Sequence, residues 1–138
     1  MAIDTLSVLY AYLASNTNIT STGITVYGPP GLPINYVLGK TIVFLGAGGM
    51  QHHKLPIALD RIQFRCYGKT SSEARSVNLA LQAALNRKSH TQVTIGGLKY
   101  VLQYAICTGG AYDMLEPSTE WPFVNVYYAV HFLENSLA

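Results

Sequence analysis

The chain has 138 residues, a length that suits one domain able to bury about two thirds of its unfolded surface. Hydrophobic residues make up 49% of it and charged residues only 12%, with a net charge of +2, whereas about a quarter of an average soluble domain is charged. This balance argues against a protein that binds nucleic acid through charge alone. It fits either a compact neutral domain or one that buries much of its surface in self-assembly.

The segment Asp4–Leu13 is predicted to form an amphipathic helix with Asp4 as its N-cap. It lacks the basic start, long apolar run and cleavage pattern of a secretory signal. No stretch approaches the ~18 apolar residues of a membrane span, so we expect no membrane association. We therefore expect synthesis in the cytoplasm, where Cys66 and Cys107 would be reduced and buried.

Two strands are predicted next. Ile24–Tyr27 reads as a short strand that ends at the rigid turn Gly28–Gly31. Lys40–Leu45 reads as a second strand, and the glycines of Gly46–Gly49 are expected to open a loop that continues to Pro56.

The clearest pattern lies between Leu59 and Asn86. Within Leu59–Tyr67, polar and apolar side chains alternate, which predicts a strand with one core face and one polar face. Thr70 and Glu73 form a capping box, so a helix is expected to begin there. Its apolar face is formed by Ala74, Val77, Leu81, Ala84 and Leu85, and its polar face by Arg75, Asn78, Gln82 and Asn86, with Arg87 and Lys88 at the helix end.

The remaining sequence predicts three strands. Thr91–Ile95 and Leu98–Ile106 flank Gly96-Gly97 and are expected to form a hairpin. A loop is predicted from Thr108 to Pro122, followed by a closing strand over Phe123–Leu133. Strands and helices do not alternate regularly. The sequence thus predicts a single α+β domain over residues 1–138, a mainly antiparallel β-sheet with two α-helices packed on one face.

Candidate catalytic and ligand sites fail on local context. Gly46–Gly49 follows a strand but precedes His52, His53 and Pro56 where a phosphate-binding motif needs a helix. His52 and His53 are adjacent and lack neighbouring ligands at metal-binding spacing, so a solvated or partner-facing loop is favoured. Cys66 or Cys107 with His131 is a conceivable nucleophile and base, but nothing local activates either thiol. We expect no catalytic, cofactor-binding or metal-binding residues and no cofactor.

A basic surface is the remaining candidate. Arg61 and Arg65, with Lys69 and Arg75 beyond them, would line a phosphate-binding surface if Tyr67 offered a stacking platform. The favoured alternative is a polar sheet face that lies in solvent or against a neighbouring subunit.

Charge is distributed unevenly along the chain. Residues 61–99 contain seven Lys or Arg and only Glu73 as an acid, whereas residues 100–138 contain four acids and no Lys or Arg. These charges are mostly expected to pair within a subunit or to lie apart in solvent. In a head-to-tail oligomer, however, the basic part of one copy would face the acidic part of the next.

Several segments together resemble one family. They are Val43–Gly49 before a variable loop, Leu59–Ala74 running into Ala80–Leu85, and Gly109-Gly110 leading through Glu116–Pro122 to a Tyr-rich last strand. In these patterns the chain resembles the tail terminator (tail completion) proteins of long-tailed bacteriophages. The similarity covers most of residues 20–133.

The resemblance implies a non-enzymatic structural protein of the virion tail and neck, made in the host cytoplasm. Such proteins form a homo-oligomeric ring, usually a hexamer, that ends tail-tube polymerisation and presents a docking surface to the head. The implied partners are other copies of the chain, the tail tube protein and a head-completion or connector protein. DNA would pass through the lumen without sequence-specific binding.

The residues expected at subunit or partner interfaces are Arg61, Arg65, His52, His53, Glu116, Glu120 and Trp121. Two alternatives remain open at this point. One is a head–tail connector or stopper protein of the same neck assembly, and the other is a small cytosolic enzyme that uses Cys66 or His131.

Overall fold

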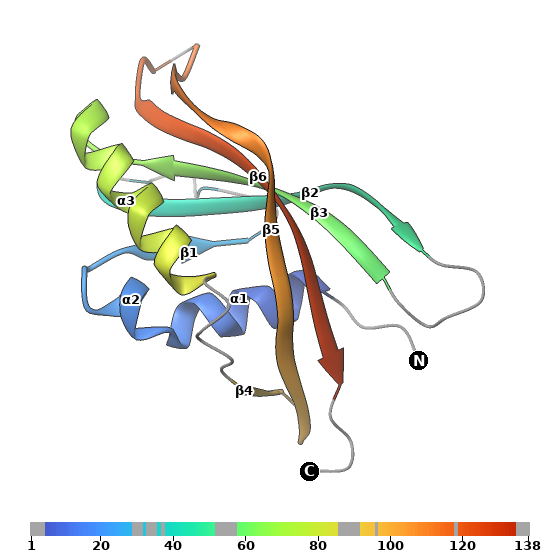
Figure 1. The fold of residues 1–138 in the computed structure, drawn as a ribbon. Coiled ribbons are helices and arrows are strands. Elements are labelled where there is room, and N and C mark those ends of the chain that lie inside the picture. The colour runs from blue at the N-terminus through green and yellow to red at the C-terminus, as the bar shows by residue number, and fades with distance from the viewer. Residues whose placement is uncertain are drawn as a thin grey trace.

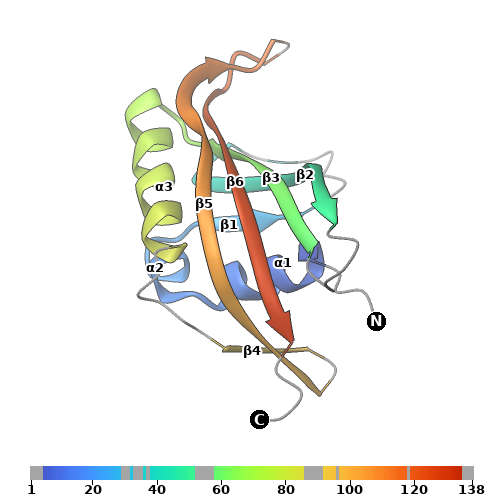
Figure 2. The ribbon, with the colours of Figure 1, turned by 45° about the vertical axis from the view of Figure 1, so that its right-hand side comes forward.

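A computed structural model describes residues 5–28, 32, 36, 38–51, 58–85, 92–95, 97–117 and 119–134. Within these residues the chain forms a six-stranded sheet in the order β1-β2-β3-β6-β5-β4 and three helices. The helices lie on one side of the sheet (Figures 1 and 2). The predicted α+β class with helices on one face is therefore confirmed. The elements are α1 (Thr5–Ser15), α2 (Thr17–Thr20), β1 (Thr25–Tyr27), β2 (Thr41–Gln51), β3 (Ala58–Tyr67), α3 (Ser71–Ala84), β4 (Gln92–Ile95), β5 (Leu98–Leu115) and β6 (Pro122–Glu134).

The sheet is antiparallel except at one end. β2 pairs with β3, β3 with β6, β6 with β5 and β5 with β4, all antiparallel. β1 instead runs parallel to β2, with Thr25 opposite Thr41. The short helix α2 lies between α1 and β1 in the chain.

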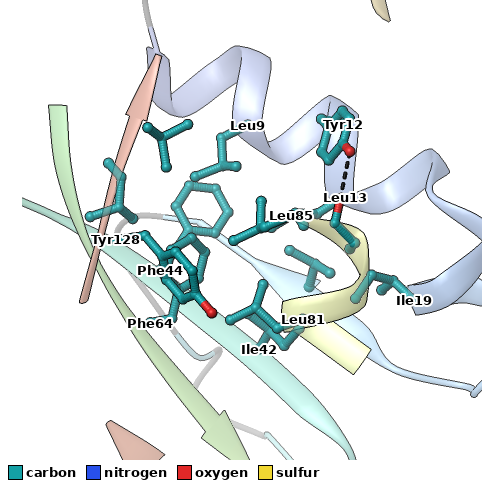
Figure 3. Packing of buried hydrophobic residues seen from close by; sticks show 14 of the residues in the cluster. Leu9, Tyr12, Leu13, Ile19, Ile42, Phe44, Phe64, Leu81, Leu85 and Tyr128 are labelled. Carbon is teal, nitrogen blue, oxygen red and sulfur yellow. Dashed lines mark hydrogen bonds between the residues drawn. The ribbon is translucent and has the colours of Figure 1, made fainter. Parts of the chain in front are cut away.

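The core lies between the sheet and the helices (Figure 3). The predicted core face of β3 is confirmed, because Ile62, Phe64 and Cys66 are fully buried there. In register with them are Ile42 and Phe44 of β2 and alternate residues of β6 from Val124 to Phe132. The apolar face predicted for α3 is also buried, as are Leu9, Tyr12 and Leu13 of α1.

The predicted capping box at the start of α3 is present. The Glu73 amide donates to Thr70 Oγ1 over 3.1 Å. The Glu73 carboxylate accepts from the Lys69 amide over 3.2 Å, one residue before the N-cap. The cap therefore satisfies one free backbone donor of the first turn of α3, the Glu73 amide, and the Lys69 amide just before the helix. The predicted N-cap Asp4 lies outside the described residues.

Two predicted loops are wrong in their first part because strands run through it, whereas residues 116–121 do connect β5 to β6 and residues 52–56 lie outside the described residues. β2 continues past Leu45 to Gln51, and the glycines predicted to open a loop form an irregularity between Gly46 and Gly49 inside the strand. β5 continues past Ile106 to Leu115, with irregularities around Tyr104, Gly109 and Tyr112. Glycine in a strand commonly marks a bulge, so the residues that suggested loops instead bend two long strands.

Three smaller predictions also need correction. The helix α2 was not predicted, although Asn16 is a good N-cap whose side chain accepts from the Asn18 amide. Asn78 was placed on the polar face of α3 but is only 6% exposed. Cys107 was expected to be buried and is exposed, because it lies at a bulge of β5 and its Sγ donates to the Gly109 carbonyl.

Candidate assembly surface

The face of the sheet that points away from the helices carries the predicted polar residues. We call it the outer face and define it by Arg61, Gln63 and Arg65 of β3 and their register partners Ala129, Tyr127 and Asn125 of β6. Because side chains alternate along a strand, residues opposite one another in register share a face. The Gln63 amide donates to Asn125 Oδ1 over 2.8 Å, which joins the two strands on this side.

Arg61 is held over an aromatic ring. Its guanidinium carbon lies 4.6 Å from the centre of the Tyr127 ring, within the range of a cation–π interaction. Its side chain is exposed, and it forms no salt bridge with the acids that the structure describes. Arg61 therefore presents an oriented cation on the outer face, and its N–H groups remain suited to an incoming carboxylate.

Arg65 has partners inside the chain. Its guanidinium lies 5.4 Å from the Phe123 ring, and Nη1 lies 3.8 Å from Glu116 Oε2. The Tyr67 hydroxyl donates to the same carboxylate oxygen over 3.0 Å, and burial raises the pKa of this tyrosine. Glu116 is thus engaged by two side chains of its own chain. The predicted interface pair Arg65 and Glu116 consequently forms an intrachain contact.

Glu120 lies in the turn between β5 and β6. The Glu116 amide donates to the Trp121 carbonyl, and the Glu120 amide donates to the Glu116 carbonyl. Glu120 has a φ of 58°, the left-handed conformation that non-glycine residues adopt at a cost. Its side chain is exposed and makes no salt bridge with the described bases. Of the two predicted interface acids, Glu120 is therefore the one directed to solvent.

Trp121 packs inside the chain. Its ring lies 5.5 Å from the Tyr36 ring and 6.5 Å from the Tyr67 ring, both edge to face. The Trp121 ring packs against a second apolar cluster on the outer face, built on Val43, Tyr67 and Phe123. The structure thus gives Trp121 a packing role at the base of the β5–β6 turn. His52 and His53, the other predicted interface residues, lie outside the described residues.

Apolar side chains lie exposed along β5. Ile106, Tyr112, Met114 and Leu115 are 46–60% exposed. Register places Ile106, Tyr112 and Met114 opposite Ala129, Asn125 and Phe123, so these three share the outer face with the arginines. Tyr112 and Met114 were missed because residues 108–122 were predicted to form a loop, and Ile106 stood at the end of a predicted strand whose outer face had not been identified. The available signal was the alternation of Tyr112 and Met114 with Asp113.

The proposed thiol chemistry finds no support in the geometry. Cys66 is fully buried, and burial raises the pKa of its thiol, which disfavours the reactive thiolate. Cys66 is in register with Val124, seven residues along β6 from His131, which corresponds to about 23 Å at ~3.3 Å per residue. Cys107 is in register with Tyr128, three residues from His131, which is itself buried. These residues do not form a nucleophile–base pair.

The residues on which a nucleic-acid-binding interpretation depended are not available for that role. Tyr67 is buried and offers no stacking platform. Arg75 pairs with Asp113 at 2.9 Å, so this base is neutralised within the chain. The Gly46–Gly49 segment lies within a strand and does not form a phosphate-binding turn.

The described residues contain neither a metal-binding cluster nor a membrane-spanning helix. They contain no group of three or more His, Cys, Asp or Glu side chains placed to hold a metal ion. None of the described helices has the length and apolar character needed to cross a membrane.

Comparison with known proteins reveals similarity in structure. No model of a protein family matches the chain, and no curated protein sequence matches it either. Among solved structures, the chain is similar to a chain of the structure described as "Virion of native gene transfer agent (GTA) particle". The TM-score is 0.56 and the sequence identity 11%, and the match covers 94% of both chains. The chain therefore has the fold of a component of that particle over nearly its whole length.

Proposed function

We propose that this chain is a structural protein of a phage-like virion and that it forms a ring that ends the tail tube. The observation that carries the proposal is the fold shared with a chain of a gene transfer agent virion over 94% of both chains. The sequence resemblance to phage tail terminators supports the more specific role.

The surface of the molecule is compatible with assembly. Exposed apolar side chains on β5 lie on the same sheet face as an oriented, exposed Arg61. A mixture of aromatic, Met and Arg side chains is the composition typical of protein–protein interfaces. We propose that the partners are further copies of this chain, six in a ring, with the tail tube on one side and a head-completion protein on the other. DNA would cross the lumen without being read.

Deleting the gene from a phage or particle that encodes it tests the role. A terminator that is missing should leave tail tubes of uncontrolled length, and purified protein added to such tubes should stop their growth. Tails of normal length that fail to join heads would instead support the alternative role of a connector or stopper. Normal tails that join heads normally would contradict both roles.

A further inference from the structure

The long strands β2 and β5 each have an edge that is covered by a neighbouring strand along only part of its length. β1 pairs with β2 only as far as Val43, and β4 pairs with β5 only as far as Val101. Among the described residues, no strand pairs with the edge of β2 that faces away from β3 between Phe44 and Gln51, or with the edge of β5 that faces away from β6 between Gln103 and Leu115. Figures 1 and 2 show the β5–β6 hairpin reaching beyond α3. Each open edge offers a row of backbone donors and acceptors to another strand.

The open edge of β5 has bulges but lacks the lysines and prolines by which proteins often block such pairing. Residues 102–115 contain no Lys and no Pro, and Asp113, the one charged residue, is paired with Arg75. Its exposed side chains include Ile106, Tyr112 and Met114. A long, apolar, uncharged edge is a site of strand addition or of aggregation unless a partner covers it.

From these edges we infer that adjacent copies join by main-chain pairing, the β5 edge of one copy (Gln103–Leu115) against the β2 edge of the next (Phe44–Gln51). This inference rests on the proposed ring and specifies how it is built. The occupant of each edge is a second copy of this chain.

Strand directions agree with this arrangement. β2, β3, β6 and β5 are neighbours in that order and each pair is antiparallel, so β2 and β5 run in opposite directions. A copy related by rotation places its β2 beside β5 in the antiparallel sense and continues the alternation. The contact is head-to-tail, and repeating it generates a ring when the rotation closes.

Charge is complementary across this contact. β3, next to β2, carries Arg61 and Arg65 on its outer face, whereas the chain from residue 100 onward has acids and no Lys or Arg. Strands are ~4.8 Å apart, so an added β5 would lie about 10 Å from β3. A long arginine side chain crosses much of that distance. Arg61, unpaired with the described acids of its own chain, would face the β5–β6 hairpin of its neighbour, whose Glu120 makes no salt bridge with the described bases.

Proline substitution at Ala105 and Ile106 tests the main-chain pairing. These consecutive residues are opposite Val130 and Ala129, and in an antiparallel ladder one of the two N–H groups points to β6 and the other to the open edge. The variant that loses the outward N–H should unfold at nearly the wild-type denaturant concentration. It should nevertheless reduce the fraction of protein in rings at least tenfold, because proline cannot donate in a ladder. Ile106→Ala keeps the N–H and is the matched control, expected to assemble more than either proline variant that folds.

Disulfide cross-linking gives a second readout that does not depend on proline. In a Cys107→Ser background, Leu45→Cys is combined in turn with cysteine at Ile106, Thr108, Tyr112 or Met114. Edge pairing brings one such pair within ~4 Å between Cβ atoms, so oxidation should yield a ladder of linked copies that ends at the closed ring. Single-cysteine variants should give no ladder.

The outcomes separate this inference from the proposed function. Edge pairing would be overturned if the proline variant that loses the outward N–H still forms rings or stops tube growth and no cysteine pair gives a cross-linked ladder. The terminator role would remain. Wild-type protein that neither forms rings nor stops tube growth would overturn the terminator role itself.

Discussion

At the scale of single residues, the Tyr12 hydroxyl of α1 caps the C-terminal end of α3. Tyr12 is fully buried, and its hydroxyl donates to the Ala84 carbonyl over 2.6 Å (Figure 3). Ala84 is the last residue of α3, where backbone carbonyls lack partners within the helix. One side chain therefore both fills the core and joins the two longer helices.

Replacing Tyr12 by Phe should lower the free energy of unfolding by about 0.5–1.5 kcal/mol, because the buried carbonyl loses this donor while the ring keeps its packing. Urea unfolding measures the change. Tyr10→Phe, at an exposed position of the same helix, is the control and should leave stability within ~0.5 kcal/mol of wild type. Equal midpoints for wild type and Tyr12→Phe would contradict the assignment.

Stability should fall in alkali because of Tyr128. Burial raises the pKa of this phenol from 10.0 to about 12. Between pH 10 and 12 the unfolded chain therefore binds fewer protons than the folded chain, so the free energy of unfolding decreases as pH rises, whereas below pH 10 this group adds no slope. Tyr128→Phe should lose less stability than wild type over that interval in urea unfolding at stepped pH. A variant with the wild-type slope would show that other groups cause the loss, and Tyr112→Phe at an exposed position is the control.

At the scale of single residues, the sequence predicted burial where the alternation was regular and failed where it was interrupted. Ile62, Phe64 and Cys66 were correctly assigned to the core because their strand has no break. The prediction that Cys107 is buried was wrong because the bulge beside it changes the direction in which side chains point. The prediction that Asn78 lies on the polar face of α3 was wrong because the burial of a helix residue depends on which elements pack against it. Residue type alone does not report those contacts.

At the scale of elements, the junction between β3 and α3 depends on a close backbone approach at Gly68. A Cβ added there would lie 2.5 Å from the Ala74 nitrogen and 2.8 Å from the Glu73 carbonyl carbon, both in the backbone of the first turn of α3. The tight connection lets the capping box follow the strand almost directly.

Gly68→Ala should therefore lower the free energy of unfolding by about 1–3 kcal/mol, because helix and strand must move apart to admit the methyl group. Gly39→Ala is the matched control: nothing lies within 4 Å of its added Cβ, so it should be close to neutral. Thermal or urea unfolding of both variants measures the difference. A Gly68→Ala protein as stable as Gly39→Ala would show that the junction relaxes freely.

The number of strands and their order along the chain were predictable from sequence, but their order in the sheet and the lengths of two strands were not. Glycines at 46, 48, 49, 109 and 110 read as loop signals, yet they lie in β2 and β5, where pairing with a neighbouring strand overrides the local preference. The candidate surface depended on those lengths. The arginines of β3 were found from their alternation, whereas the exposed apolar residues of β5 and the open edges required the sheet itself.

At the scale of the whole molecule, opposite charges are separated along the chain and within the sheet. Glu116 is engaged by Arg65 and Tyr67 of its own chain, so Glu120 is the better candidate for a contact between copies. We expect Glu120→Lys to impair ring formation more at low salt than at high salt, because salt screens the new repulsion. Light scattering across a salt series measures assembly. Glu120→Gln, which removes the charge at the same position without introducing a repulsion, is the control. If Glu120→Lys assembles normally at low salt, the charge of Glu120 does not help to set the register between copies.

Electron microscopy of the purified protein, alone at high concentration and mixed with tail tubes, tests the central claim most directly. The account predicts closed rings with a central opening, either free or bound at one end of each tube, and tubes that no longer elongate. Protein that stays monomeric under both conditions, with bare tube ends and continued growth, would contradict it.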